Sequence, residues 1–316
     1  MTSSPMNIYS YYAFGLRIHS EMELPELPAL PFGDGSADAE IKLAPHTAYT
    51  AELDNNPYEH MVKNGQVLFY VPDHAYFSIE AGRTIAITPL AGADIRLVRL
   101  YVLGSCMGAL LLQRRLLPLH GSAVEIDGKA YAVVGDSGAG KSTLASVFIH
   151  NGYRLISDDI IAVSISQEEK VPIAIPSYPQ QKLWQESLEH LGVAERPYEP
   201  IFGRETKYSV PVATSFREDP LPLAGIFILE KAEGMDGAAP VIRPLGKLER
   251  IQTLFTHTYR QFLVPRMDLQ EWHFTTSVQL LRHCTMHSLK RAATGFSAHR
   301  LQQMIVDTIS GGTIHE

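Results

Sequence analysis

Residues 135–142 read Gly-Asp-Ser-Gly-Ala-Gly-Lys-Ser, a complete G-x-x-x-x-G-K-[ST] phosphate-binding loop, or Walker A motif. The apolar run 131–134 in front of the loop predicts a short strand, and residues 143–150 behind it predict a helix. In this context the glycines let the backbone curl so that its N–H groups point at phosphate oxygens, at the positive end of the helix dipole. The stretch therefore predicts an α/β fold and a nucleoside triphosphate ligand.

The motif also gives roles to individual side chains. Lys141 is expected to reach the β- and γ-phosphates, and the Ser142 hydroxyl is expected to complete a Mg²⁺ shell. The residues expected to hold the nucleotide are Gly135, Asp136, Ser137, Gly138, Ala139, Gly140, Lys141, Ser142 and Thr143. The alternative, a glycine turn with an incidental lysine, is disfavoured by the matching strand and helix.

Two adjacent carboxylates follow, Asp158 and Asp159, after a predicted strand at 153–156. A strand, a helix and a strand of this length make a βαβ unit with parallel strands side by side, so both strand ends should face the ligand. One carboxylate suits Mg²⁺, and the other suits a general base for a hydroxyl nucleophile. Adjacent strand residues point to opposite faces, so both can act only if the chain leaves regular strand geometry. A solvated turn is the alternative.

A histidine precedes the phosphate loop. His120 begins an apolar run that leads through the Asp127-Gly128 hairpin signal into the strand feeding the loop. This antiparallel arrangement brings His120 near the same sheet edge. Taken alone, a histidine at a strand start is more often structural than catalytic.

These residues together resemble the HPr kinase/phosphorylase superfamily. In that family a histidine leads a hairpin into a Gly-Asp-Ser-Gly-x-Gly-Lys-Ser loop, and an Arg-Leu-x-x-Asp-Asp strand follows, as residues 119–163 do here. The resemblance implies ATP- and Mg²⁺-dependent phosphorylation of a serine hydroxyl. It implies that Lys141 holds phosphate, that Ser142 and Asp159 serve Mg²⁺, and that Asp158 is the base with His120 close by. The division of roles between the two aspartates stays open.

The chain departs from the bifunctional members of that family. Their second glycine-rich signature with Glu-Ile-Asn, tied to the reverse reaction, does not follow Asp159; the chain gives instead Pro176-Ser177-Tyr178-Pro179 and Arg204-Glu205-Thr206-Lys207-Tyr208. This layout, and the opening at 12–21, are similar to kinases of lasso-peptide precursors. That resemblance implies a precursor peptide as substrate, modified at a C-terminal serine, and leaves room for a homo-oligomer.

Composition narrows the remaining classes. The 316 residues carry 27 basic and 34 acidic side chains, a net charge of −7 without a long run of either sign, so no nucleic-acid or membrane footprint is expected. The two cysteines are too few for a disulfide framework, and the N-terminus lacks signal-peptide features, which favours the cytoplasm. The longest apolar run, residues 100–112, is too short to span a bilayer and predicts a buried helix.

The chain is expected to divide into a β-rich N-terminal module over residues 1–95 and a P-loop HPr-kinase-like domain with a mixed sheet over 96–316. Other predicted elements are a helix at 94–113, a strand at 160–165, a helix at 180–191, a buried strand at 223–229, and helices at 248–263 and 298–309.

Several single residues permit two interpretations. Lys182, Arg204 and Lys207 could steady the transferring phosphate, with Lys207 the strongest candidate, or could be ordinary solvated charges. Trp184 is expected in the core. His283, Cys284 and His287 could suggest a metal site, but they lack a second ligand cluster.

Three functions compete on these grounds. The leading one is a serine kinase acting on a precursor peptide, with ATP and Mg²⁺ as cofactors. The second is a kinase of a small hydroxylated metabolite, and the third is a nucleotide-binding regulatory module without catalysis. The aspartate pair favours an enzyme, because a binding module needs no base beside its Mg²⁺ ligand.

Overall fold

The computed structural model describes residues 7–31, 35–45, 49–192, 198–201, 206–233 and 238–311. Its N-terminal part is a seven-stranded sheet in the order β1-β2-β3-β7-β6-β5-β4. The strands are β1 (Tyr9–Ala13), β2 (Leu16–Ser20), β3 (Ala39–Leu43), β4 (His60–Lys63), β5 (Gln66–Val71), β6 (Ala75–Glu80) and β7 (Thr84–Pro89). β3 runs parallel to both β2 and β7, and the other neighbours are antiparallel. The predicted β-rich module is therefore present.

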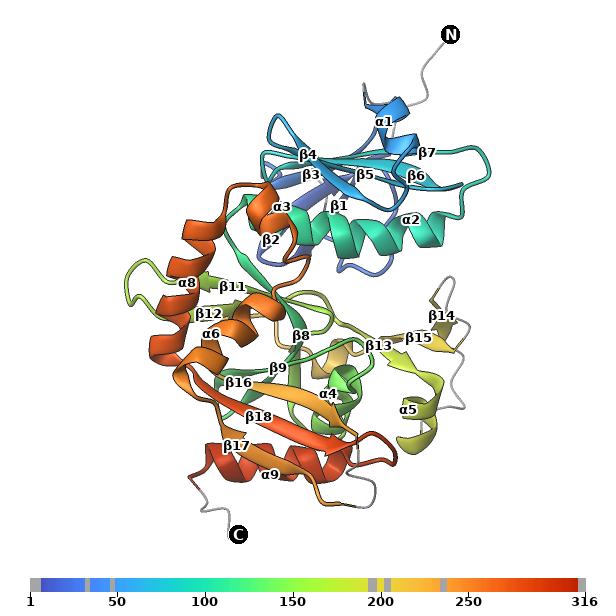
Figure 1. Cartoon of the computed structure of the whole chain (residues 1–316). Helices are drawn as coiled ribbons and strands as arrows, with labels where there is room; N and C mark the ends of the chain where they lie inside the picture. The colour runs from blue at the N-terminus through green and yellow to red at the C-terminus, as the bar shows by residue number, and fades with distance from the viewer. Residues whose placement is uncertain are drawn as a thin grey trace.

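A long helix covers one face of this sheet (Figure 1). It consists of α2 (Ile95–Tyr101), a π-helical turn η1 (Val102–Cys106) and α3 (Met107–Gln113). Its buried side chains share one hydrophobic core with the N-terminal strands, whose inward residues include Phe69 and Phe77. Burying this apolar face stabilises the pairing of helix and sheet. The short α1 (Thr50–Asp54) packs on the opposite face through Leu53.

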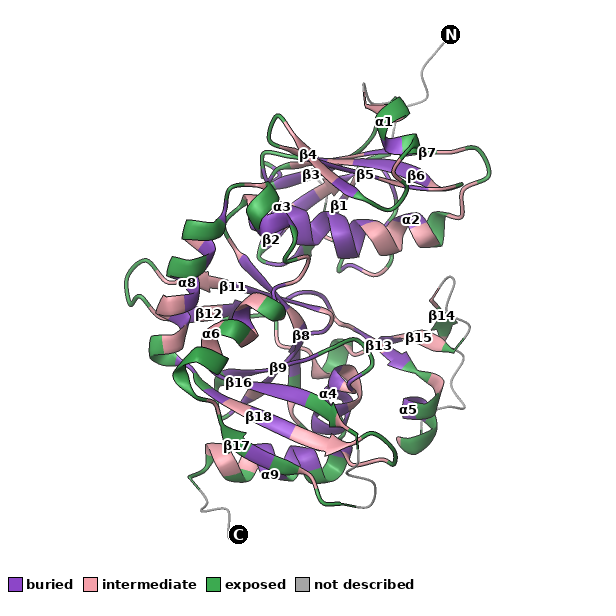
Figure 2. Ribbon diagram, viewed as in Figure 1, coloured by how far each residue is buried: buried purple, intermediate pink, exposed green. Residues whose placement is uncertain are grey.

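The same helix meets the length and composition of a membrane span. Residues Ile95–Gln113 have a mean hydropathy of 1.7, and 67 % of that window is buried against the protein. The sequence analysis counted only the apolar run at residues 100–112 and found it too short for a membrane span. The helix itself starts earlier and includes Arg96 and Arg99. Figure 2 shows its buried face turned toward the N-terminal sheet, as in the core helix of a folded domain.

The second part is built on an eight-stranded mixed sheet, ordered β10-β8-β11-β12-β16-β18-β17, with β9 between β16 and β8. Its strands are β8 (Leu117–Ile126), β9 (Lys129–Val134), β10 (Arg154–Ser157), β11 (Ile160–Ile165), β12 (Pro172–Ile175), β16 (Leu221–Ala232), β17 (Val241–Pro244) and β18 (Thr285–Ala292). β16 is parallel to β9 and β18. The mixed α/β fold predicted from the sequence is confirmed.

Helices cover both faces of this sheet (Figure 1). On one face α4 (Lys141–His150) and α9 (Ala298–Ile309) bury Leu144, Phe148 and Leu301. On the other face α6 (Lys247–Thr256) and α8 (Gln270–His283) bury Leu254 and Leu280. The short α7 (Leu263–Arg266) contacts β4, and so joins the two parts of the molecule.

A small third sheet flanks α4. It consists of β13 (Gln180–Trp184), β15 (Lys207–Pro211) and β14 (Glu199–Pro200), and β13 leads directly into α5 (Gln185–His190). The 3-10 turn η2 (Ala213–Ser215) follows β15.

Three sequence predictions of secondary structure are wrong in part. The two strands of the predicted βαβ unit, β9 and β10, are not neighbours in the sheet. β8 lies between them and pairs antiparallel with both. The predicted helix at 180–191 is a strand followed by α5. The predicted helix at 248–263 ends at Thr256, and Pro265 lies inside the short α7 rather than after a long helix. The strands at 160–165 and 223–229 and the helix at 298–309 are confirmed.

Candidate functional site

The phosphate loop connects β9 to α4 as predicted. Gly135, Gly138 and Gly140 have φ of 152°, 81° and 109°, backbone conformations that favour glycine. A Cβ on Gly135 would lie 2.4 Å from the carbonyl oxygen of Leu229, so the close approach of β16 also requires glycine there. The loop thus delivers curled backbone to the N-terminus of α4, the arrangement that binds phosphate.

Lys141 is the first residue of α4, and its side chain folds back over the loop. Its Nζ donates to the carbonyl oxygens of Gly135 at 2.8 Å and Asp136 at 2.9 Å. It is 7 % exposed and so lies buried against the loop. Burial lowers the pKa of its ammonium from the ordinary value, and the charges of Asp158 and Asp159 oppose that shift.

The two aspartates have different environments. Asp158 is buried; its Oδ1 accepts from the hydroxyl of Ser122 at 2.5 Å, and its Oδ2 accepts from the backbone N–H of Lys182 at 2.9 Å. Asp159 has φ of 72°, so the chain leaves strand geometry there, as both carboxylates acting together would require. Only Asp159 of the pair lines the main cavity.

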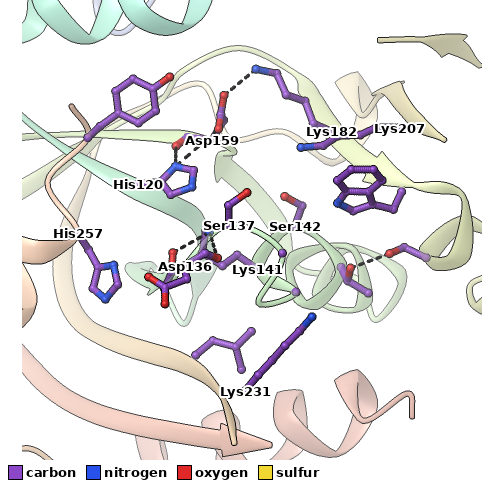
Figure 3. Close-up of a pocket in the computed structure, with 18 of the residues that line it drawn as sticks. His120, Asp136, Ser137, Lys141, Ser142, Asp159, Lys182, Lys207, Lys231 and His257 are labelled. Atoms are coloured by element: carbon purple, nitrogen blue, oxygen red, sulfur yellow. Dashed lines mark hydrogen bonds and ion pairs between the residues drawn. The ribbon is translucent and has the colours of Figure 1, made fainter. Parts of the chain in front are cut away.

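Lys182 forms a partly buried ion pair with Asp159, their Nζ and Oδ2 atoms lying 2.6 Å apart (Figure 3). Burial disfavours both charges. The attraction between them outweighs this, so that the pKa of Asp159 lies below its usual range and the pKa of Lys182 above its own. Sequence reasoning ranked Lys182 below Lys207, because a single lysine carries no signal of a tertiary partner.

His120 lies in β8, beside Asp159. Its Nδ1 is 3.1 Å from the carbonyl oxygen of Asp159 and 3.7 Å from the carboxylate oxygen Oδ1. Since a carbonyl only accepts, Nδ1 carries the proton in this bond, and Nε2 is the nitrogen that can accept one. Burial, followed by the charge of Lys141, lowers the pKa of His120, while Asp159 opposes the shift.

A cavity of about 1070 Å³ unites these groups (Figure 3). Every predicted loop residue lines it except Ala139, and so do His120, Asp159, Lys182 and Lys207. Its walls come from both parts of the molecule, from α2 and η1 on one side and from residues 256–262 and 293–298 on others. The predicted nucleotide-binding residues and the candidate catalytic residues thus meet in one place, with Asp158 directly behind the wall.

The cavity has an excess of positive charge in an acidic chain. Lys and Arg residues that line it are Lys141, Lys182, Lys207, Lys231, Arg260 and Arg291, against the acidic Asp136, Asp159 and Glu186. Such a concentration of cations favours an anionic ligand such as a triphosphate. Lys231, Arg260 and Arg291 were not predicted, because they follow no motif. Arg204 lies outside the described residues.

Trp184 also differs from its prediction. It ends β13 and is 39 % exposed rather than buried in the core, and the Nζ of Lys207 lies 5.4 Å from its ring centroid. Both residues line the cavity, so the third sheet presents a cation beside an aromatic ring to the ligand space.

The donors present fit a magnesium ion held with substrate phosphates. Ser142 and Asp159 both line the cavity and offer a hydroxyl and a carboxylate oxygen, and Mg²⁺ in phosphate sites takes only one or two carboxylates. Within the described ranges no group of three or more His, Cys, Asp and Glu side chains is arranged to hold a metal. Cys284, one of the three residues that could suggest a metal site elsewhere, uses its thiol to donate a hydrogen bond to the carbonyl oxygen of Leu223.

Comparisons with known proteins identify the segment that builds the phosphate loop. Residues 114–194 match the family model described as the HPr Serine kinase C-terminal domain. The HPr kinase/phosphorylase of Lacticaseibacillus casei is 34 % identical over 94 residues, which are 29 % of this chain and 29 % of that protein. That of Limosilactobacillus reuteri is 43 % identical over 61 residues, 18 % of this chain and 19 % of the relative.

A solved structure, the Hpr(Ser) kinase/phosphatase from Coxiella burnetii, aligns with 61 % of this chain and 94 % of its own at 16 % identity and a TM-score of 0.31. The chain spans less than a third of the length of the curated relatives above. The sequence similarity lies in the stretch that contains His120, the phosphate loop and the two aspartates. Residues 114–194 are thus the part of this chain that is similar to the HPr kinase/phosphorylase family.

Proposed function

We propose that this protein is an ATP- and Mg²⁺-dependent kinase that phosphorylates a serine hydroxyl of a peptide. The observation that carries the proposal is that a complete phosphate loop and the pair Asp159–His120 line the same cavity. A protein that only binds a nucleotide needs the loop and a carboxylate for Mg²⁺, but it has no use for a proton acceptor such as the His120 imidazole beside that carboxylate.

The chain's own groups divide the work. The loop N–H groups and Lys141 bind the triphosphate, and Ser142 and Asp159 would hold Mg²⁺, which supplies charge neutralisation at the β- and γ-phosphate oxygens when it is bound. Lys182, with its side chain 16 % exposed at the cavity wall, keeps Asp159 ionised and in place. Lys207 adds a positive charge on the same side of the cavity (Figure 3).

We assign the base to Asp158, with His120 as the second candidate. The Asp158 carboxylate has about four acceptor positions, of which the bonds from Ser122 and Lys182 occupy two, so it retains capacity for a proton. Its burial behind the cavity wall requires the acceptor hydroxyl to come deep into the site. His120 needs no such approach, because it lines the cavity and its Nε2 can accept a proton.

The acceptor side of the cavity favours a peptide over a small metabolite. The cavity lining extends from the phosphate loop to Leu97, Tyr101 and Phe262, beyond the reactive groups, and so offers surface to more of a chain than the reacting hydroxyl alone. We propose a ribosomally made lasso-peptide precursor, phosphorylated at a C-terminal serine, as the acceptor, acted on in the cytoplasm without a nucleic-acid or membrane partner.

Intact-mass analysis tests this proposal. Candidate precursor peptides encoded beside the gene are incubated with the full chain, ATP and Mg²⁺, and tandem mass spectrometry locates the modification. We expect the gain of a phosphoryl group on the terminal serine, and no gain in the control peptide in which alanine replaces that serine and so removes its hydroxyl. Phosphorylation of small hydroxylated metabolites but of no peptide would favour the metabolite kinase, and ATP binding without transfer to either would favour the regulatory module.

A further inference from the structure

The cavity extends in two directions from the phosphate loop. One arm leads past His120 and Asp159 to η1 and residues 259–262. The other leads past Thr143 to α5 and to the loop 293–298 that follows β18. Figure 1 shows α5 to the right of α4, and the stacking of His190 on Phe296 places the end of α5 beside this last loop.

The reactive groups fix which arm holds which end of a nucleotide. A triphosphate is linear, and its transferred phosphoryl group must lie at the acceptor, opposite the nucleoside. Asp159 and His120 lie on the first arm, so the acceptor enters there. Thr143 is on the other side of the loop, and its hydroxyl lies 2.8 Å from that of Ser187 in α5. The nucleoside is therefore directed along α5.

Two aromatic rings stand at the end of that second arm. His190, the last residue of α5, and Phe296 stack with ring centroids 4.5 Å apart and an interplanar angle of 22°, and both line the cavity. Phe296 is only half-buried, so part of its ring is accessible to a ligand. Gly295 beside it has open space where a Cβ would be, which leaves room at the ring.

An arginine ties this aromatic pair to the phosphate loop. The guanidinium of Arg291, at the end of β18, donates from Nε and Nη2 to the carbonyl oxygen of Ala139, at 3.1 and 3.0 Å. Two bonds from one planar group fix the start of the 293–298 loop relative to the phosphate-binding backbone. The distance between phosphate site and aromatic pair is thereby held by the protein itself.

We propose that His190 and Phe296 form the nucleobase subsite, which takes the base of the nucleotide by stacking on the Phe296 ring. This inference rests on the proposed binding of a nucleotide at the phosphate loop. A stacking platform recognises the π-face that every base has, so the subsite distinguishes nucleotides from inorganic polyphosphates and tolerates both adenine and guanine.

Binding measurements with three probes test the subsite. ADP, GDP and inorganic tripolyphosphate are titrated in Mg²⁺ into the full chain and its variants by calorimetry. Phe296→Ala should lower the affinity for ADP and GDP by about 5- to 150-fold, the usual range for losing one base–aromatic stack. It should leave the affinity for tripolyphosphate unchanged. Phe296→Trp should retain the affinity. Phe262→Ala, the same truncation on the opposite arm of the cavity, is the matched control and should change none of the three.

The outcomes separate this inference from the function on which it rests. The subsite is overturned, and nucleotide binding stands, if Phe296→Ala leaves the affinity for ADP unchanged or if Phe262→Ala lowers the affinity for ADP. Equal losses of ADP and tripolyphosphate in Phe296→Ala, not restored by Phe296→Trp, show that the residue only shapes the loop, and also overturn it. If the unaltered protein binds neither ADP nor tripolyphosphate, the proposed function itself fails.

Discussion

The segment 114–194 and the segment 206–301 line the same cavity, but they differ in how their residues are constrained. In the first segment, the phosphate loop needs glycine at three positive-φ positions and a lysine and a serine at fixed places. In the second, Lys231, Arg260 and Phe296 need only present a charge or a ring to the cavity. Residues that a backbone conformation requires form a motif that can be recognised in the sequence. Residues that only have to reach the cavity wall follow no motif, because tertiary packing decides which side chains line it.

The largest expected effect sharpens this comparison with one cation from each segment. Lys141→Ala should abolish phosphoryl transfer, because its charge acts on the triphosphate inside the loop. Lys231→Ala removes the same charge from an exposed position on β16 and should cost far less. Steady-state kinetics with thermal melting of both variants makes the measurement. Retained turnover in a folded Lys141→Ala variant would remove the loop from the mechanism.

The next effect concerns the partly buried ion pair. Asp159→Asn should shift the Mg²⁺ dependence of transfer to higher concentrations and lower the melting temperature, because it leaves the partly buried ammonium of Lys182 without its counter-charge. Adding Lys182→Met should recover part of the melting temperature and none of the activity. A double variant as unstable as Asp159→Asn alone would show that the orphaned charge is not the cause.

The two candidate bases give a smaller effect. Asp158→Asn should lower kcat by about 10²–10⁴-fold, the usual contribution of a general base, with nucleotide affinity nearly unchanged. His120→Gln, which keeps a donor toward the Asp159 carbonyl, should lower kcat less. Single-turnover rates and ADP titrations compare the two. A larger loss in His120→Gln would transfer the base role to His120, and two variants with ordinary rates would exclude both.

The smallest expected effect is an absence of reaction. Incubation of phosphorylated peptide with the enzyme, Mg²⁺ and excess inorganic phosphate should yield no pyrophosphate. The reverse reaction needs a site that holds the attacking phosphate in line with the phosphoserine, and we predict that this chain lacks it, because the second glycine-rich signature expected for the reverse reaction does not follow Asp159. Appreciable pyrophosphate would make those relatives the better guide to the second half of the chain.

Much of the fold could be predicted because local patterns decide it. The long helix at 95–113 and the helix at 298–309 follow their apolar periodicity. The 180–191 helix was wrongly predicted because Leu183, Trp184, Leu188 and Leu191 stand at helical spacing in the sequence, although the first two lie on β13 and Leu188 lies on α5. The insertion of β8 between β9 and β10 is set by long-range pairing, on which the local pattern is silent.

The site shows the same division. The loop residues, Asp159 and His120 lie in one cavity, as their spacing led us to expect. The pairing of Lys182 with Asp159 and the exposure of Trp184 could not be predicted, because both depend on how the third sheet packs beside α4. The roles of the two aspartates stay a prediction. Their positions differ, because Asp159 lines the cavity and Asp158 is buried behind its wall.

The measurement that tests the account most directly is the stoichiometry of transfer. The unaltered enzyme is mixed with Mg²⁺-ATP and its peptide, and ADP and phosphopeptide are quantified together over one time course. We predict equal amounts of ADP and of singly phosphorylated peptide, both dependent on Mg²⁺ and both lost in Lys141→Ala. ADP without phosphopeptide, or phosphopeptide formed equally well by Lys141→Ala, would contradict the claim that this cavity transfers phosphate from a nucleotide to a serine.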